Sequence, residues 1–311
     1  MASAQTLSNR SGRRTFWSQR GKGVVRAVRP GLSRMINSVL TRLPLGAIFC
    51  AMLLTAGYFL FVNTAWGHSV DNIAYHGRKA LAHPMVEYGD RILDAVSKVT
   101  LVLGALVILV IGLIRRSLAV AVLAVMGYGS AVVGAEVLKH ILPWHPLVPT
   151  DASLPIALQE GSYPSGHATI GVSLAVAFVL ISAARWRLWL AMLSGFVSAS
   201  FATGVLFVGW HRPSDALGGI AWSGFCMSLA AAAAVIFRGR QIRSLEQGAW
   251  VLIGNALLAA VVIALAWTAA GGEWNEHHGA EGPFLALTLL IIAASFSLTA
   301  WFAWELRHVD W

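Results

Sequence analysis

The sequence predicts an all-α, polytopic membrane protein with about eight transmembrane helices. Of its 311 residues, 57% are hydrophobic and only 12% are charged. Eight stretches reach the roughly 18 apolar residues that a membrane-spanning helix needs. Helices are expected because a bilayer core offers backbone groups no water, and runs of about 20 residues are too long for barrel strands. The predicted spans are Leu45–Trp66, Ser97–Ile114, Ser117–Leu138, Ala168–Ala184, Leu188–Trp210, Ala216–Phe237, Ala249–Ala269 and Pro283–Trp304.

The distribution of Lys and Arg predicts how these spans are oriented. The first 42 residues carry nine of them, and no Asp or Glu precedes Asp71. With eight spans, the loops and termini on that side hold seventeen of the 23 basic residues. Because cytoplasmic loops are enriched in Lys and Arg, both termini are expected in the cytoplasm. We expect an integral protein of a bacterial plasma membrane.

The chain divides into three predicted parts. Residues 1–42 form a basic cytoplasmic tail, and the apolar spacing after Pro30 predicts an interfacial helix within it. Anionic lipid headgroups are its expected partner, whereas nucleic acid is not, because no base-reading feature accompanies the charge. Residues 43–247 form the membrane bundle, whose six-helix catalytic bundle contains the segments that carry chemistry. Residues 248–311 add two C-terminal transmembrane helices.

Two histidines at predicted span edges are the most informative residues. His167 ends the segment 162–167, Ser-Tyr-Pro-Ser-Gly-His, and His211 lies in the segment 209–215, Gly-Trp-His-Arg-Pro-Ser-Asp. Two histidines suit a two-step phosphoryl transfer, one as nucleophile and one as proton donor. Asp215 follows His211 by four residues, which on a helix places both side chains on one face. There the carboxylate can fix the tautomer of the imidazole and stabilise the imidazolium.

The order of these segments resembles a known family. It looks like the type 2 phosphatidic acid phosphatases, lipid phosphate phosphatases that share a site plan with vanadium haloperoxidases. Their pattern is a Lys followed six residues later by Arg-Pro, then Pro-Ser-Gly-His, then Ser-Arg, five residues, His, three residues and Asp. The chain matches in order and spacing over residues 139–215, about a quarter of its length. The resemblance therefore predicts the catalytic segments 139–146, 162–167 and 209–215.

The resemblance implies a role for each matching residue. His211 would attack phosphorus, Asp215 would orient it, and His167 would protonate the leaving oxygen and then activate water. The phosphoryl oxygens would be held by Lys139, Ser165 and Gly166. No cofactor is expected.

Two arginines of the family pattern are missing. Pro146-Leu147 stands in place of Arg-Pro, and Gly204-Val205 in place of Ser-Arg. Both arginines would normally grip the phosphate with paired hydrogen bonds. Arg212 and His145 are the candidate replacements.

Other polar and aromatic residues have simpler interpretations. Glu136 is expected to form an intrahelical ion pair with Lys139, and Ser162 to cap the turn before Pro164. Trp210 is typical of an interfacial aromatic belt. The charged stretch Tyr75–Leu93 could form an outer helix over the site. Histidines and glutamates of the loop 271–282 are expected to be solvated, so we predict no metal site.

The predicted function is hydrolysis of a lipid phosphate monoester or diphosphate at the outer leaflet. Polyprenyl diphosphate, phosphatidic acid and phosphatidylglycerol phosphate are candidate substrates. A membrane phosphotransferase that moves the phosphoryl or headgroup unit to a lipid or sugar acceptor is the alternative. A proton-coupled transporter is disfavoured, because relay groups should lie nearer the bilayer midplane.

Overall fold

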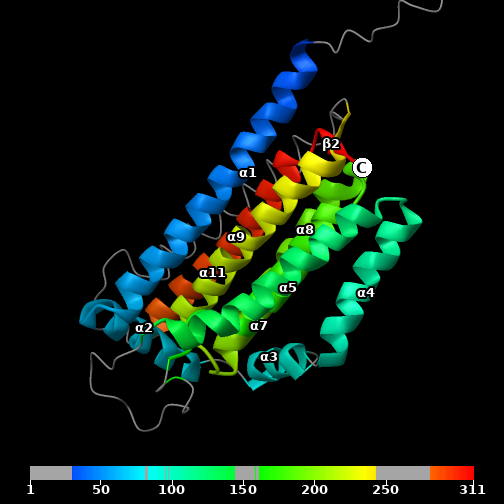
Figure 1. Ribbon diagram of the computed structural model, residues 1–311. Helices are drawn as coiled ribbons and strands as arrows, with labels where there is room; N and C mark the ends of the chain where they lie inside the picture. Colours follow the sequence, from blue (N-terminus) through cyan, green and yellow to red (C-terminus); the bar gives the residue numbers. More distant parts are fainter. Residues whose placement is uncertain are drawn as a thin grey trace, which may run out of the picture.

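The computed structural model describes residues 30–80, 83–94, 96, 98–143, 158, 161–242 and 281–311. These residues form a helical bundle with one two-stranded ribbon (Figure 1). Five helical segments in them are long and apolar enough to cross a membrane, and two shorter apolar helices accompany them. The predicted class, an all-α polytopic membrane protein, is confirmed.

The first helix differs from its prediction in extent. Helix α1 covers Pro30–Gly57 and continues into the π-helical turn η1, Tyr58–Val62. The expected interfacial helix and the first span therefore form one continuous helix. Val39 and Leu43 are buried in the same core cluster as Phe302 of the last helix. The apolar stripe before the span packs on protein at these positions, because α1 has a partner there.

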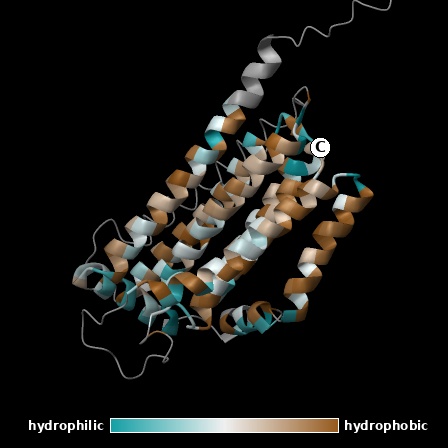
Figure 2. Cartoon of the chain, viewed as in Figure 1, coloured by the Kyte–Doolittle hydropathy of each residue, from teal (hydrophilic) through white to brown (hydrophobic). Residues whose placement is uncertain are grey.

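Three short elements follow at one end of the bundle: α2 (Ala65–Gly77), η2 (Arg78–Ala80) and α3 (His83–Asp94). Helix α2 begins after Thr64, whose hydroxyl accepts the Gly67 N–H at 3.0 Å. These short helices are markedly more hydrophilic than the long ones (Figure 2). The single outer helix expected from Tyr75 to Leu93 is thus two helices.

Five helices build the centre of the chain. They are α4 (Lys98–Ile114), α5 (Leu118–Ile141), α7 (Gly166–Ile181), α8 (Ala184–Phe207) and α9 (Pro213–Arg238). Each corresponds to a predicted span. Helix α7 begins two residues before its predicted start, because Ser165 acts as its N-cap.

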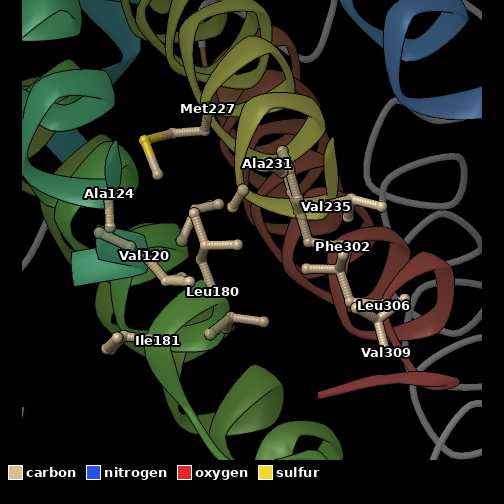
Figure 3. Packing of buried hydrophobic residues seen from close by; sticks show 14 of the residues in the cluster. Val120, Ala124, Leu180, Ile181, Met227, Ala231, Val235, Phe302, Leu306 and Val309 are labelled. Carbon is tan, nitrogen blue, oxygen red and sulfur yellow. The ribbon is translucent and has the colours of Figure 1, made fainter. Parts of the chain in front are cut away.

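The last described helix is α11, Glu281–Glu305. Its apolar side chains meet those of α5, α7 and α9 in the main core, where Leu180, Met227 and Phe302 are fully buried (Figure 3). Small residues let these helices approach closely: a Cβ on Gly127 of α5 would lie 2.6 Å from the Ala230 Cβ of α9.

The end of the bundle beyond α11 is closed by polar contacts. Strand β1 (Arg240–Gln241) pairs antiparallel with β2 (Val309–Asp310). Arg187, fully buried, donates hydrogen bonds to the carbonyls of Ser182, Leu306 and Val309. Helices α9 and α11 consequently end on the same side. The predicted span Ala249–Ala269 lies outside the described residues.

Candidate active site

The described parts of the three predicted catalytic segments lie at the end of the bundle opposite the ribbon, where α5 ends and α7 and α9 begin (Figure 1). Both histidine segments immediately precede or open a helix. Lys139 lies in the last turn of α5. The fold therefore brings together three segments that are separated by about 20 to 45 residues in the sequence.

His211 and Asp215 form a buried pair. The His211 Nδ1 and Asp215 Oδ2 atoms are 3.3 Å apart. The expectation that both residues lie on one helical face was wrong, because α9 begins only at Pro213. Instead, the Asp215 carboxylate reaches back over the helix start and also accepts the Arg212 N–H at 2.9 Å. An acidic side chain in a first turn commonly binds free amides there and is stabilised by the helix dipole.

Ser162 also contacts this carboxylate. Its hydroxyl donates a hydrogen bond to Asp215 Oδ2, and the Ser165 N–H donates one to the Asp215 carbonyl at 2.8 Å. The sequence predicts only a turn cap at Ser162. The structure places its hydroxyl instead as a third group on the carboxylate oxygen that also contacts His211 and the Arg212 N–H.

His167 lies in the first turn of α7. Ser165 is the N-cap of that helix, and its hydroxyl accepts the Ala168 N–H at 3.3 Å. The His167 imidazole meets the Trp210 indole edge-to-face, with ring centroids 5.1 Å apart. Trp210, expected to mark the aromatic belt, is thus a neighbour of the predicted proton donor.

Lys139 lies against the start of α7. Its Nζ is 2.8 Å from Glu136 Oε1, which matches the expected ion pair. A Cβ added to Gly166 would lie 2.7 Å from that carboxylate oxygen and 3.2 Å from the Lys139 Nζ. A side chain at this position would force the ends of these two charged side chains to move away from the backbone.

Arg212 is held by protein acceptors. Its Nε donates to Asn72 Oδ1 at 2.7 Å and its Nη1 to the Leu158 carbonyl at 3.1 Å. The side chain is buried and borders a small cavity with His68, Asp71 and Asp215. The guanidinium therefore connects the start of α9 to α2.

Other residues occupy the positions where the family pattern has its two arginines. Val205 is fully buried, and its carbonyl accepts the N–H groups of Trp210 and His211 at 3.0 and 3.2 Å. Gly204 faces Gly89 of α3 so closely that a Cβ on Gly89 would lie 3.1 Å from the Gly204 carbonyl oxygen. A Cβ on Gly204, where the family pattern has Ser, would make only ordinary contact with α3, 3.7 Å from the Gly89 Cα. Val205, where the pattern has Arg, lies in the packed interior. His145 and Pro146-Leu147 lie outside the described residues.

Sequence reasoning missed the polar face of α2. Asp71, Asn72 and Tyr75 contact Ser214, Arg212 and Gly209 of the third catalytic segment. Their spacing of i, i+1 and i+4 on a helix was the available signal, but their partners are more than 130 residues away.

Metal ligands do not gather in the part of the chain that the structure describes, where no group of three or more His, Cys, Asp or Glu side chains could hold an ion. The histidines of the loop 271–280 are outside that part.

A comparison with known protein families agrees with this arrangement of the Lys, Pro-Ser-Gly-His and His-x-x-x-Asp segments. Residues 118–240 match the PAP2 superfamily. The resemblance seen in the sequence is thereby confirmed, over α5 to β1. This PAP2 segment contains Lys139, His167, His211 and Asp215, whereas α1 to α4 and α11 lie outside it. Comparisons with curated proteins and with solved structures gave no match.

Proposed function

We propose that the protein is a metal-independent lipid phosphatase that hydrolyses a phosphate monoester or diphosphate through a phosphohistidine. The match to the PAP2 superfamily supports phosphoric ester hydrolysis, and the apolar spans support a substrate held in the membrane. The observation that carries the mechanism is the 3.3 Å contact between His211 Nδ1 and Asp215 Oδ2. When the Nδ1–H group donates a hydrogen bond to the carboxylate, Nε2 carries no proton. Its lone pair is then free to attack phosphorus.

Two displacement steps complete the reaction. In the first, His211 Nε2 forms a bond to phosphorus while the bond to the lipid oxygen breaks, and protonated His167 gives that oxygen its proton. In the second, water attacks phosphorus, His167 takes a proton from it, and the phosphorus–nitrogen bond breaks. Inorganic phosphate leaves, and both histidines return to their starting states.

The groups around Gly166 are proposed to hold the phosphoryl oxygens. Lys139 supplies a positive charge, and the Gly166 amide lies at the start of a helix, where anions are favoured. The Ser165 hydroxyl uses a lone pair for its capping bond, so its proton can be donated to phosphate. Arg212 and His145 are the further candidates. Fixed donors of this kind stabilise charge that develops in the transition state.

The charge distribution supports an orientation in the membrane. Arg115, Arg187 and Arg240 belong to the ribbon end of the bundle, opposite the histidines. Since basic residues favour the cytoplasmic side, we place both termini in the cytoplasm and the site on the extracytoplasmic face. The proposed location is a bacterial plasma membrane. Phosphatidic acid, phosphatidylglycerol phosphate and polyprenyl diphosphate remain the proposed substrates, and anionic headgroups the partners of the basic tail.

Trapping the intermediate tests this function. The purified protein is mixed with lipid substrates labelled in the phosphoryl group and quenched within one turnover. We expect label on the protein that is stable in alkali and lost in acid, and its absence in His211→Ala. His140→Ala, an exposed histidine of α5, is the matched control and should retain the label. Wild-type turnover by His211→Ala would refute the proposal, and label that appears on an added alcohol would show a phosphotransferase.

A further inference from the structure

Helix α2 contacts the third predicted catalytic segment through three polar residues, Asp71, Asn72 and Tyr75. The Tyr75 hydroxyl donates to the Gly209 carbonyl at 2.9 Å, and the Arg212 Nε donates to Asn72 at 2.7 Å. Asp71 receives two bonds from one residue. The Ser214 N–H lies 3.1 Å from its Oδ1 and the Ser214 hydroxyl 2.6 Å from its Oδ2. These contacts flank His211 on both sides.

The start of α9 needs such an external partner. Amides in the first turn of a helix have no acceptor within the helix and are usually satisfied by an N-cap side chain. The N-cap here is Arg212, whose side chain has donors only, and Pro213 has no N–H. The Ser214 amide is therefore satisfied by a carboxylate from another helix. Asp71 is 1% exposed, so this contact is shielded from water.

We propose that α2 sets the position of the 209–215 segment and that Asp71 is a positioning residue for the proposed nucleophile. It acts on His211 through Ser214 and Asp215, which is the next residue along the first turn of α9. This inference rests on the proposed function for its catalytic consequence. The contacts themselves join a helix outside the PAP2 segment to residues 209–214 within that segment.

Charges around Asp71 give it a second effect on the site. Burial raises the pKa of its carboxyl to about 7, and the Asp215 carboxylate adds to the rise. The bonds from Ser214 and the Arg212 charge oppose it. Of the other groups that face this cavity, His68 belongs to α2 and Tyr163 precedes α7. Helix α11 also packs on α2, but its Glu305 lies at the end of α11 that is far from α2.

Ionisation of Asp71 near neutral pH would add a second negative charge to the first turn of α9. The electrostatic environment of His211 would then change over the same pH range. A carboxamide in place of the carboxyl keeps an acceptor for the Ser214 amide but cannot ionise. Asp71→Asn and Asp71→Ala therefore separate the effect of the charge from that of the hydrogen bonds.

The experiment measures kcat/KM between pH 5 and 9 for these two variants with a lipid phosphate in detergent. We expect Asp71→Ala to lose about 10-fold to 100-fold, the range for a hydrogen bond to a charged group. Asp71→Asn should recover most of that loss and should lack the inflection near pH 7. Asp90→Asn, an exposed carboxyl on α3, is the matched control and should behave as wild type.

A readout that needs no turnover keeps the inference separate from the proposed function. In protein labelled with ¹⁵N-histidine, the His211 ring signals, assigned with His211→Gln, should depend on pH differently in the wild type and in Asp71→Asn, because only the wild type gains the Asp71 charge. If phosphate release fails but this difference is seen, the proposed function falls and the coupling stands. The inference is overturned if Asp71→Asn leaves both the ring signals and the pH profile as in wild type.

Discussion

The Nδ1 atom of His211 lies 3.3 Å from Oδ2 of Asp215, and that same oxygen accepts the Ser162 hydroxyl and the Arg212 amide. One carboxylate oxygen thus gathers groups from both histidine segments. The orientation of the imidazole depends on a shared acceptor that the fold fixes from two directions.

Weakening this shared acceptor should lower turnover to graded extents. We expect Asp215→Asn to reduce kcat on the order of 100-fold or more, because an amide does not stabilise an imidazolium as a carboxylate does. Ser162→Ala removes one bond but leaves the charge and the other two donors, so its loss should be smaller, about 10-fold. Equal losses for the two variants in steady-state kinetics would contradict this ranking.

The His167 assignment predicts a dependence on the leaving group. General acid catalysis contributes about 100-fold to 10,000-fold when the departing oxygen needs a proton. His167→Ala should therefore slow phosphoenzyme formation strongly with a lipid alkyl phosphate and weakly with p-nitrophenyl phosphate. Rapid-quench measurements compare the two. Trp210→Phe, which keeps an aromatic ring beside the imidazole, is the control and should show no such difference between substrates.

Chelators should leave activity intact, whereas vanadate should block it. The proposed phosphate partners are Lys139 and helix-start amides, so neutralisation of the phosphoryl charge does not require an ion. Vanadate can adopt the five-coordinate geometry of the transferring phosphorus. Phosphate release is measured after dialysis against EDTA. Inactivation that a divalent ion reverses would reveal a metal site.

Arg212 is expected to act as a connection to α2 as well as a charge near the site. Arg212→Ala should lower both kcat/KM, by about 10-fold to 100-fold, and the thermal midpoint in detergent. Asn72→Ala should reproduce part of both effects, because it removes the acceptor of Arg212 Nε. Arg212→Lys should not restore the wild-type values, since an ammonium cannot reproduce a planar fork. A higher KM with an unchanged midpoint would indicate direct phosphate binding instead.

The raised pKa of Asp71 predicts how stability depends on pH. In the folded protein this pKa is about 7, above its ordinary value of 3.8, so the folded state binds more protons between those values. Stability contributed by this group is therefore greatest at low pH and is lost as the pH rises toward 7. Relative to wild type, Asp71→Asn should gain thermal midpoint between pH 5 and pH 8. A constant difference across this range would contradict the assignment.

The long helices could be predicted because hydropathy is a local property of the sequence. Described helices such as α5, α8 and α9 lie within a few residues of their predicted spans. The motif residues were also found locally, since each segment carries its own spacing. The start of α9 was misplaced because proline and the capping contacts of Asp215, not apolar periodicity, decide where that helix begins.

The role of α2 could not be predicted in the same way. Its 13 residues have too little apolar character to stand out as a span, and Asp71 meets Ser214 across 143 positions. The contacts of Trp210 and Ser162 could not be predicted for a related reason. An interfacial tryptophan and a turn serine have common local explanations, and only the folded structure shows that Trp210 lies against His167 and that Ser162 donates to Asp215.

Buried Arg187 has a consequence for biogenesis. Its guanidinium donates hydrogen bonds to the carbonyls of Leu306 and Val309. The ribosome adds these two residues about 120 positions after Arg187. A charged group in a dry interior without acceptors is costly. Since chains fold from the N-terminus as they emerge, the α7–α8 pair cannot reach its final packing until α11 has entered the membrane. Helix α11 therefore completes the packing of helices that are inserted much earlier in synthesis.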